Sequence, residues 1–161
     1  MLLKANWLVH PKETGNARTA VSDKVLAMLC RHYAREKQHV MRFHHHAEHI
    51  RDAEIRRALL KIAAREAEHA SSLGEKILAL GGTLPEVMNI RYSQENTWSY
   101  LRSDLDEEHR CLEEVAEDKA SLGDSFPDIA DILERIELDA QRHREQLRKL
   151  FESDVMTPWA A

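Results

Sequence analysis

Apolar residues recur along most of this chain at alternating steps of three and four positions, with polar residues between them. This spacing is typical of helices that bury one face. The pattern predicts four helices, at about 22–49, 52–80, 93–122 and 125–151. Each is far longer than the average helix of a globular protein, and no run of β-branched residues indicates a strand. The sequence therefore predicts an all-α protein.

Residues that start and stop helices support these boundaries. Asp52 is suited to cap the second helix at its N-terminus, and Gly81-Gly82 is suited to end it. Gly123 ends the third helix, and the segment 125–128 opens the fourth with capping-box spacing and a proline in the first turn. The boundary between the first two helices is marked by neither glycine nor proline.

The connections between the predicted helices differ in length. Short links join the first helix to the second and the third to the fourth, so each of these pairs should lie antiparallel. The link 81–93 is long enough to cross the length of a bundle, which an up-down-up-down bundle would not need. We expect one four-helix bundle at 22–152 with this long crossover, an N-terminal extension at 1–21 and a short C-terminal tail at 153–161.

Each apolar stripe is interrupted near its middle by residues that bind metals. The first three stripes place Glu36, Glu66 and Glu108 there, and the second and fourth place His69 and His143. A buried carboxylate is costly unless it is paired or coordinates a metal. Three that converge without a cation would repel one another and take up protons. Divalent metals remove that cost, and this set of oxygen and nitrogen donors suits iron or manganese.

The segment Glu66-Ala67-Glu68-His69 has Glu-x-x-His spacing, which puts its first and last side chains on one face of a helix. Alone, this motif is common by chance in helical sequences. Its value here comes from its place within the apolar stripe and from the matching charges at the same depth in the other helices. The alternative interpretation, ordinary charged residues on stripes assigned to the wrong face, stays open.

Composition narrows the classes of function. The net charge of −5 mixes both signs without a basic stripe, so we expect no nucleic-acid partner. The longest apolar runs are far too short to span a membrane, and the apolar start lacks the features of a signal peptide. Cys30 and Cys111 form no disulfide framework and no C-x-x-C motif, which fits a reducing compartment. We therefore expect a cytoplasmic protein.

Two segments carry a family resemblance. The second predicted helix has Glu-Ala-Glu-His-Ala at 66–70, then Glu-Lys-Ile-Leu at 75–78 and the double glycine. The third has Tyr-Leu-Arg-Ser-Asp-Leu-Asp-Glu-Glu at 100–108, which is the more specific match. Over 22–151 the chain resembles bacterioferritins and, more distantly, rubrerythrins. One long crossover is also the connectivity of ferritin-like bundles, so the resemblance implies a ferritin-like four-helix bundle.

The resemblance also implies a site and an activity. Glu36 would be a terminal ligand, Glu66 and Glu108 would bridge two metals, and His69 and His143 would be terminal nitrogen ligands. The metals would be a di-iron pair, with manganese as an alternative. Their partners would be O₂ or peroxide, and the activity that of a ferroxidase or a peroxide-reducing oxidoreductase.

The fourth predicted helix departs from the family pattern. The family carries Glu-x-x-His there, but the position three before His143 is Ala140. The neighbouring acid, Asp139, points about 100° away from Ala140 around the helix axis. His39 repeats the Glu-x-x-His spacing after Glu36, and it is either a solvated histidine, an outer partner of the metal ligands, or a second candidate for the missing ligand. Asp139, His39 or water would then fill the weaker metal position.

Other departures concern haem and assembly. The residue after Glu66, where bacterioferritins carry the haem-ligating methionine, is Ala67, so we expect no haem. Phe43 stands where the family has tyrosine. Only nine residues, 153–161, follow the last predicted helix, too few for the additional helix that lines the four-fold axis of the large cages. We expect a homodimer or another small homo-oligomer.

Further polar residues have two interpretations each. His44-His45-His46, with His39 and His49, would form an exposed helix terminus whose imidazoles favour the helix dipole, or a metal entry or secondary site. Asp104, one turn before Glu108, would be an outer partner of the metal ligands or part of a solvated acidic face.

Two other interpretations of the whole bundle remain. A degenerate ferritin-like bundle could serve as a structural or partner-binding module, which Ala140 favours. A haemerythrin-like metal-binding bundle is suggested by the i, i+4 spacing of His32 with Glu36 and of His109 with Glu113. The second of these pairs lies off the predicted core stripe, which argues against that family.

Overall fold

The computed structural model describes residues 17–88 and 96–156, with side chains for 23–88 and 96–152. Its elements are α1 (Ala17–His49), α2 (Ala53–Ala79), α3 (Thr97–Leu122), the short 3₁₀ helix η1 (Gly123–Ser125) and α4 (Pro127–Met156). These residues form four long helices and no strand, which confirms the all-α prediction.

The observed helix ends differ from the predicted ones mainly at the outer termini. The first helix begins at Ala17, inside the stretch 1–21 that the pattern assigned to an extension. The third begins at Thr97 after its cap residue Asn96, whereas the predicted start near 93 lies outside the described residues. The fourth continues to Met156, beyond the predicted end. Helical hydrogen bonding continues past the last apolar position of a stripe, so periodicity alone misplaces such ends.

The double glycine after α2 ends that helix and lets the chain leave it close to α1. Gly81 has a φ of 79°, a conformation that costs a residue with a Cβ roughly 1–2 kcal/mol. The N–H groups of Gly81 and Gly82 donate to the carbonyls of Leu78 and Ile77, which satisfies the last turn. A Cβ on Gly82 would lie 2.6 Å from Cδ1 of Leu26 on α1.

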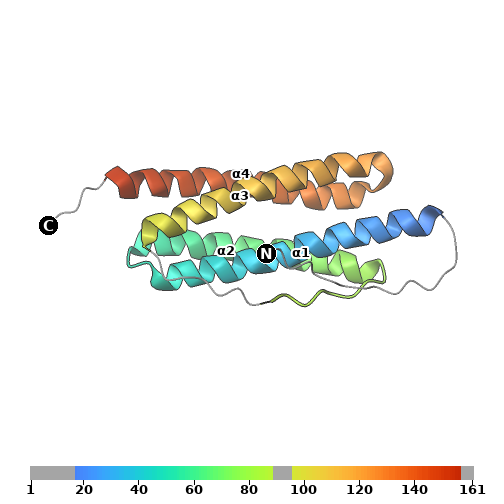
Figure 1. Ribbon diagram of the computed structural model, residues 1–161, viewed down its shortest axis with the longest axis horizontal. Helices are drawn as coiled ribbons and strands as arrows, with labels where there is room; N and C mark the ends of the chain where they lie inside the picture. Colours follow the sequence, from blue (N-terminus) through green and yellow to red (C-terminus); the bar gives the residue numbers. More distant parts are fainter. Residues whose placement is uncertain (1–16, 89–95, 157–161) are drawn as a thin grey trace, which may run out of the picture.

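The four helices form two antiparallel pairs, α1 with α2 and α3 with α4, which pack face to face (Figure 1). Contacts between the pairs join α2 to α4 and α1 to α3. Following the colours of Figure 1, the two helices are antiparallel in each of these four pairs, and the parallel helices are diagonal to one another. α2 ends at one end of the bundle and α3 begins at the other, which is the arrangement that a long crossover between them requires.

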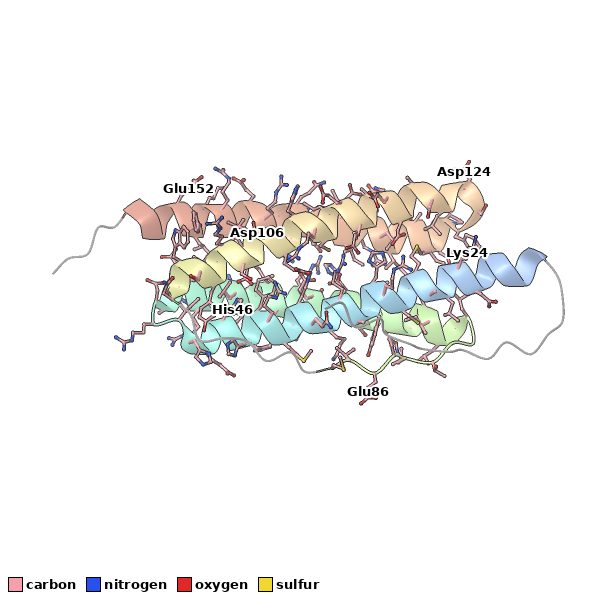
Figure 2. The ribbon with its side chains drawn as sticks, in the orientation of Figure 1. Lys24, His46, Glu86, Asp106, Asp124 and Glu152 are labelled. Carbon is pink, nitrogen blue, oxygen red and sulfur yellow. The ribbon has the colours of Figure 1, made fainter. Side chains whose placement is uncertain are left out.

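Side chains fill the space between the helix pairs (Figure 2), and the apolar ones form two separate clusters. The first apolar cluster, toward the α3–α4 turn, includes Leu29, Leu73, Ile77, Val115, Ile129, Leu133 and Ile136. The second, toward the α1–α2 turn, includes Phe43, Ile50, Leu59, Ile62, Leu101 and Leu147. Between them lies a band of buried polar residues, called the polar layer below: Glu36, His39, Glu66, His69, Glu108 and His143. Among the described residues, no helix combines the length and the apolar character that a membrane span requires.

The cap of α2 gives a test of the fold that does not involve the core. Asp52 is exposed, and its side chain accepts hydrogen bonds from the backbone N–H groups of Glu54 and Ile55, at 2.8 and 2.9 Å. We expect Asp52→Ala to lower the free energy of unfolding by about 1 kcal/mol, because both N–H groups lose their acceptor. Urea denaturation measures this. Asp52→Asn keeps an acceptor and is the matched control, and equal stability of the two variants would contradict the assigned cap.

Candidate metal centre

The polar layer brings together side chains from all four helices. Its carboxylates are almost inaccessible: the exposed fractions are 0% for Glu36, 1% for Glu108 and 3% for Glu66. The imidazoles of His69 and His143 are 6% and 7% exposed. The five residues that the stripes predicted as ligands are therefore all buried at one depth, between the two apolar clusters.

Glu66 occupies the middle of this arrangement. Its Oε2 lies 3.3 Å from Nδ1 of His69, and its Oε1 lies 2.8 Å from Nδ1 of His143. Glu36 approaches on one side, with Oε2 3.4 Å from the same nitrogen of His69. Glu108 approaches on the other, with Oε1 3.8 Å from Nδ1 of His143. One carboxylate thus lies between two carboxylate–imidazole pairs, which is an arrangement suited to two adjacent cations.

The residues present fit a group of divalent metals. Both carboxylate oxygens of Glu36 and both of Glu108 are buried without a hydrogen-bond partner among the described side chains, as is Nδ1 of His39. Leaving such atoms unpaired costs free energy that a cation would recover. Ligand atoms of Glu36, Glu66 and His69 all lie within 4.8 Å of one another, and so do those of His39, Glu66 and Glu108.

The same burial shifts the proton affinities of the layer. Burial, and then the neighbouring charge of Glu66, raise the pKa of Glu36 to about 8. Burial also raises the pKa of Glu108. For Glu66, burial alone would raise the pKa, but the close contacts with Glu36, His143 and His69 outweigh it and hold the pKa well below its usual value. Burial would lower the pKa values of His69 and His143, but the carboxylates outweigh it and raise them to about 10 and 9.

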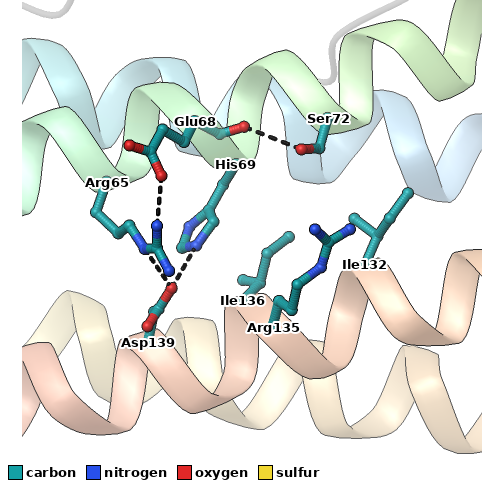
Figure 3. A pocket seen from close by; sticks show the side chains of 8 residues that line it. All are labelled: Arg65, Glu68, His69, Ser72, Ile132, Arg135, Ile136 and Asp139. Atoms are coloured by element: carbon teal, nitrogen blue, oxygen red, sulfur yellow. Dashed lines mark hydrogen bonds and ion pairs between the residues drawn. The ribbon is translucent and has the colours of Figure 1, made fainter.

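Asp139 of α4 lies opposite His69 and Arg65 of α2 (Figure 3). Its Oδ2 is 3.0 Å from Nε2 of His69, the ring nitrogen that faces away from Glu36 and Glu66. Arg65 and Arg142 donate to the same carboxylate at 2.7 and 2.8 Å. Burial alone would raise the pKa of Asp139, but the hydrogen bonds with Arg65, His69 and Arg142 outweigh it and lower the pKa. The structure thus places Asp139 where it orients His69 rather than where it reaches the position of the missing ligand.

A small cavity of about 70 Å³ adjoins this contact between α2 and α4 (Figure 3). Its lining residues are Arg65, Glu68, His69, Ser72, Ile132, Arg135, Ile136 and Asp139. His69 and Asp139 line the cavity, whereas Glu36, Glu66 and Glu108 do not.

The predicted register of α4 agrees with the structure. Ile136, Ala140 and His143 are 1%, 3% and 7% exposed, so all three face the interior. Ala140 packs with the first apolar cluster. The helix that carries a Glu-x-x-His motif in bacterioferritins therefore offers only His143 from this face.

No family model matches the sequence, and no curated protein matches it. Solved structures do match. The bacterioferritin of Desulfovibrio desulfuricans matches with a TM-score of 0.77 and 22% identity, over 86% of this chain and 84% of that one. The bacterioferritin-related dodecameric thioferritin of Bacteroides fragilis matches at 0.74 and 15% identity, over 83% and 87%. A ferritin-like di-iron-carboxylate protein of Bacillus anthracis matches at 0.70 and 21% identity, over 81% and 96%.

The chain has the ferritin-like fold. Each of these alignments covers most of both chains, so the likeness includes all four helices and their connectivity rather than one helix pair. The fold class predicted from the stripes, the crossover and the two motif segments is confirmed.

Within this ferritin-like bundle, the histidine group at the end of α1 is divided between surface and core. His44 and His49 are exposed, in agreement with the prediction of an exposed terminus. His46 is 3% exposed, so that prediction is wrong for this residue. Its Nδ1 lies 2.8 Å from Oδ2 of the fully buried Asp104, and its ring stacks on Tyr100 at 4.3 Å. A histidine beside an apolar position can be buried when an acid on the facing helix forms a hydrogen bond with its ring.

Cys111 is 2% exposed and was not among the predicted site residues. Its sulfur lies within 4.8 Å of ligand atoms of Glu36 and His39. Burial raises the pKa of this thiol well above its usual value. The signal was present, because Cys111 follows Glu108 by three positions and so shares its face of α3.

The pair that suggested a haemerythrin-like site lies on the surface of the ferritin-like bundle. The side chains of His109 and Glu113 are 59% and 62% exposed, with Nε2 and Oε1 3.5 Å apart. This pair is therefore not part of the polar layer.

The raised pKa values predict how the stability of the metal-free protein depends on pH. A histidine whose pKa rises from 6.5 to about 9 or 10 on folding, as for His143 and His69, stabilises the fold below pH 6.5 and loses this effect as pH rises through the folded value. Glu36, raised from 4.5 to about 8, destabilises the fold increasingly over that interval. Both effects have the same sign. After chelation, the free energy of unfolding should fall between about pH 6.5 and 9, by up to about 1.4 kcal/mol per pH unit for each extra proton bound.

Urea denaturation at several pH values measures this fall. Protein saturated with metal is the control, because its ligands must be deprotonated and its stability should fall less. A metal-free protein whose stability is constant or rises across this range would contradict the charge distribution described for the polar layer.

Proposed function

We propose that this ferritin-like bundle binds a pair of iron or manganese ions and acts as a ferroxidase or peroxide-reducing oxidoreductase. The proposed ligands are Glu36, Glu66, His69, Glu108 and His143. The observation that carries the proposal is the convergence of three buried carboxylates, two of which have no hydrogen-bond partner among the described residues. Such a group is unfavourable without cations, and oxygen with imidazole nitrogen is a donor set for iron or manganese.

The contacts within the polar layer support a role for each proposed ligand. Glu66 lies between His69 and His143 and is the proposed bridge, with Glu36 on the His69 side. Glu108 lies on the His143 side and is the second proposed bridge. When bound, the metal pair would supply the electrons that reduce O₂ or peroxide.

Residues outside the ligand set orient and enclose it. Asp139 accepts from Nε2–H of His69, which leaves Nδ1 facing the carboxylates, where its lone pair would be available to a bound metal. Arg65 and Arg142 hold Asp139 in place. The two apolar clusters exclude water from both sides of the layer.

The comparisons support iron as the metal. The Desulfovibrio desulfuricans structure is described as a di-iron site in different catalytic states, and the Bacillus anthracis protein as a di-iron-carboxylate protein. A bacterioferritin from Rhodobacter capsulatus contains haem iron. In this chain Ala67, on the exposed face of α2, has no side chain that could ligate haem.

A second candidate function is a structural or partner-binding module that has lost the metals. Ala140 favours it, because α4 presents only one ligand-type side chain, His143, on its inner face. The metal content after loading with Fe(II) distinguishes the two functions.

We expect untagged protein, loaded anaerobically with Fe(II) and freed of excess metal, to hold close to two ions per chain. Glu66→Ala should lose most of this metal, because a bridging ligand serves both ions. Elemental analysis of the desalted protein measures the result. Glu75→Ala, an exposed glutamate on the same helix, is the matched control and should bind as the wild type does. A wild-type stoichiometry near zero would rule out the proposed function in favour of the structural module.

Haem and assembly form a separate prediction. Because Ala67 cannot ligate haem iron, purified protein should show no Soret absorption even after incubation with haemin. We further expect a homodimer or small homo-oligomer, which sedimentation velocity measures. A Soret band, or a sedimentation coefficient suited to two dozen chains, would show this prediction to be wrong.

A further inference from the structure

His39 is a buried histidine of α1 whose two ring nitrogens have different surroundings. The residue is 2% exposed and follows Glu36 by one turn. Its Nδ1 has no hydrogen-bond partner among the described residues and lies 4.0 Å from Oε2 of Glu66. A nitrogen of this ring lies within 4.8 Å of carboxylate oxygens of Glu66 and Glu108. One edge of the ring therefore faces the proposed metal ligands.

The other edge faces a carboxylate on α3. Nε2 lies 3.4 Å from Oε1 of Glu107. Glu107 also pairs with Arg42, at 3.6 Å, and with Arg110. An imidazole that donates its Nε2–H to a carboxylate is fixed as the tautomer with a lone pair on Nδ1. The contact with Glu107 thus directs that lone pair into the polar layer.

His69 on α2 has the same arrangement. Its Nε2 lies 3.0 Å from Asp139, and its Nδ1 lies 3.3 Å from Glu66 and 3.4 Å from Glu36. Histidines that bind metals commonly donate their second N–H to a carboxylate in this way. The layer therefore contains two imidazoles, from different helices, each with Nε2 next to an acid outside the layer and Nδ1 facing its carboxylates.

We propose that His39 is a ligand of the metal pair, oriented by Glu107, and that it supplies from α1 the donor that Ala140 lacks on α4. This inference rests on the proposed function and completes its ligand set. The centre then has three carboxylates and three imidazoles, from Glu36, Glu66, Glu108, His39, His69 and His143.

A structural role for His39 is the rival explanation. His32 and His46 stand seven positions before and after it on α1, and each also pairs with an acid of α3. The ring nitrogens of these two histidines lie 2.8 Å from Asp118 and Asp104, respectively. Such pairs could serve only to hold α1 against α3. His32 is a close control for this role, since it is also 2% exposed and belongs to none of the ligand groups found among the described residues.

The test compares His39→Gln with His32→Gln in untagged, chelator-treated protein. Anaerobic titration with Fe(II), and with Co(II) followed by its visible absorption, gives the number of ions and the affinity of each. We expect His39→Gln to keep one ion and to bind the other at least roughly tenfold more weakly, with a changed Co(II) spectrum, while His32→Gln binds both as the wild type does. Equal affinities and spectra in the two variants would overturn the inference.

A second pair of variants tests whether His39 is a ligand even if circular dichroism shows that His39→Gln does not fold. Glu107→Gln removes the orienting carboxylate from His39, and Asp106→Asn removes an equal charge from the exposed neighbour. We expect the weaker ion to bind roughly 10–100-fold less tightly in Glu107→Gln than in Asp106→Asn. Equal affinities would overturn the role of His39 alone, whereas a wild-type protein that takes up no metal would overturn the proposed function together with this inference.

Discussion

The structure depends on how a band of charge is accommodated inside a helical bundle. Three carboxylates lie at 0–3% exposure between two apolar clusters, where each charge costs several kcal/mol if it is left unpaired. The imidazoles of His39, His69 and His143 offset part of this cost, and cations would offset the rest. The clusters above and below do more than stabilise the fold. Because they use the same helix faces as the ligands, their packing fixes the depth and rotation of every ligand-bearing turn.

Acids outside the polar layer then determine which way its histidines point. Asp139 crosses from α4 to α2 and holds His69, while Arg65 and Arg142 neutralise Asp139 itself. On the opposite side Glu107 of α3 approaches His39 of α1. These contacts between acids and histidines join neighbouring helices. They also determine which ring nitrogen of each histidine faces the polar layer.

The fold and the burial of the candidate ligands could be predicted because both follow from periodicity. Steps of three and four place Glu36, Glu66 and Glu108 on the same lines as the core leucines, and the structure buries all three. An apolar stripe of this kind identifies only the centre of the buried face of a helix. α1 packs against both α2 and α3, so its buried face is wider than one stripe. His39 and His46 lie on a parallel line toward α3, and a single stripe does not include them.

The position of Asp139 could not be predicted for a related reason. Asp139 is rotated about 100° from Ala140 around the helix axis, which predicts a position at the edge of the buried face. The residue is nevertheless buried, with only 5% of its surface exposed. It is buried because Arg65 and His69 of α2 lie opposite it, and pairing between helices leaves no signature in the spacing of one helix. Asp104 and His46 illustrate the same limit, since each was interpretable as solvated until the facing helix was in place.

Moving a ligand from α4 to α1 has an electrostatic consequence. The family pattern of four carboxylates would balance the four charges of two divalent ions, whereas three carboxylates and three neutral imidazoles leave one positive charge. Asp139 does not restore the balance, because Arg65 and Arg142 already pair with it. In a dry interior, where charges interact strongly, an excess positive charge opposes the removal of further electrons from the metals. The substitution at position 140 would therefore favour the reduced, divalent state of the proposed centre without requiring any change in the fold that surrounds it.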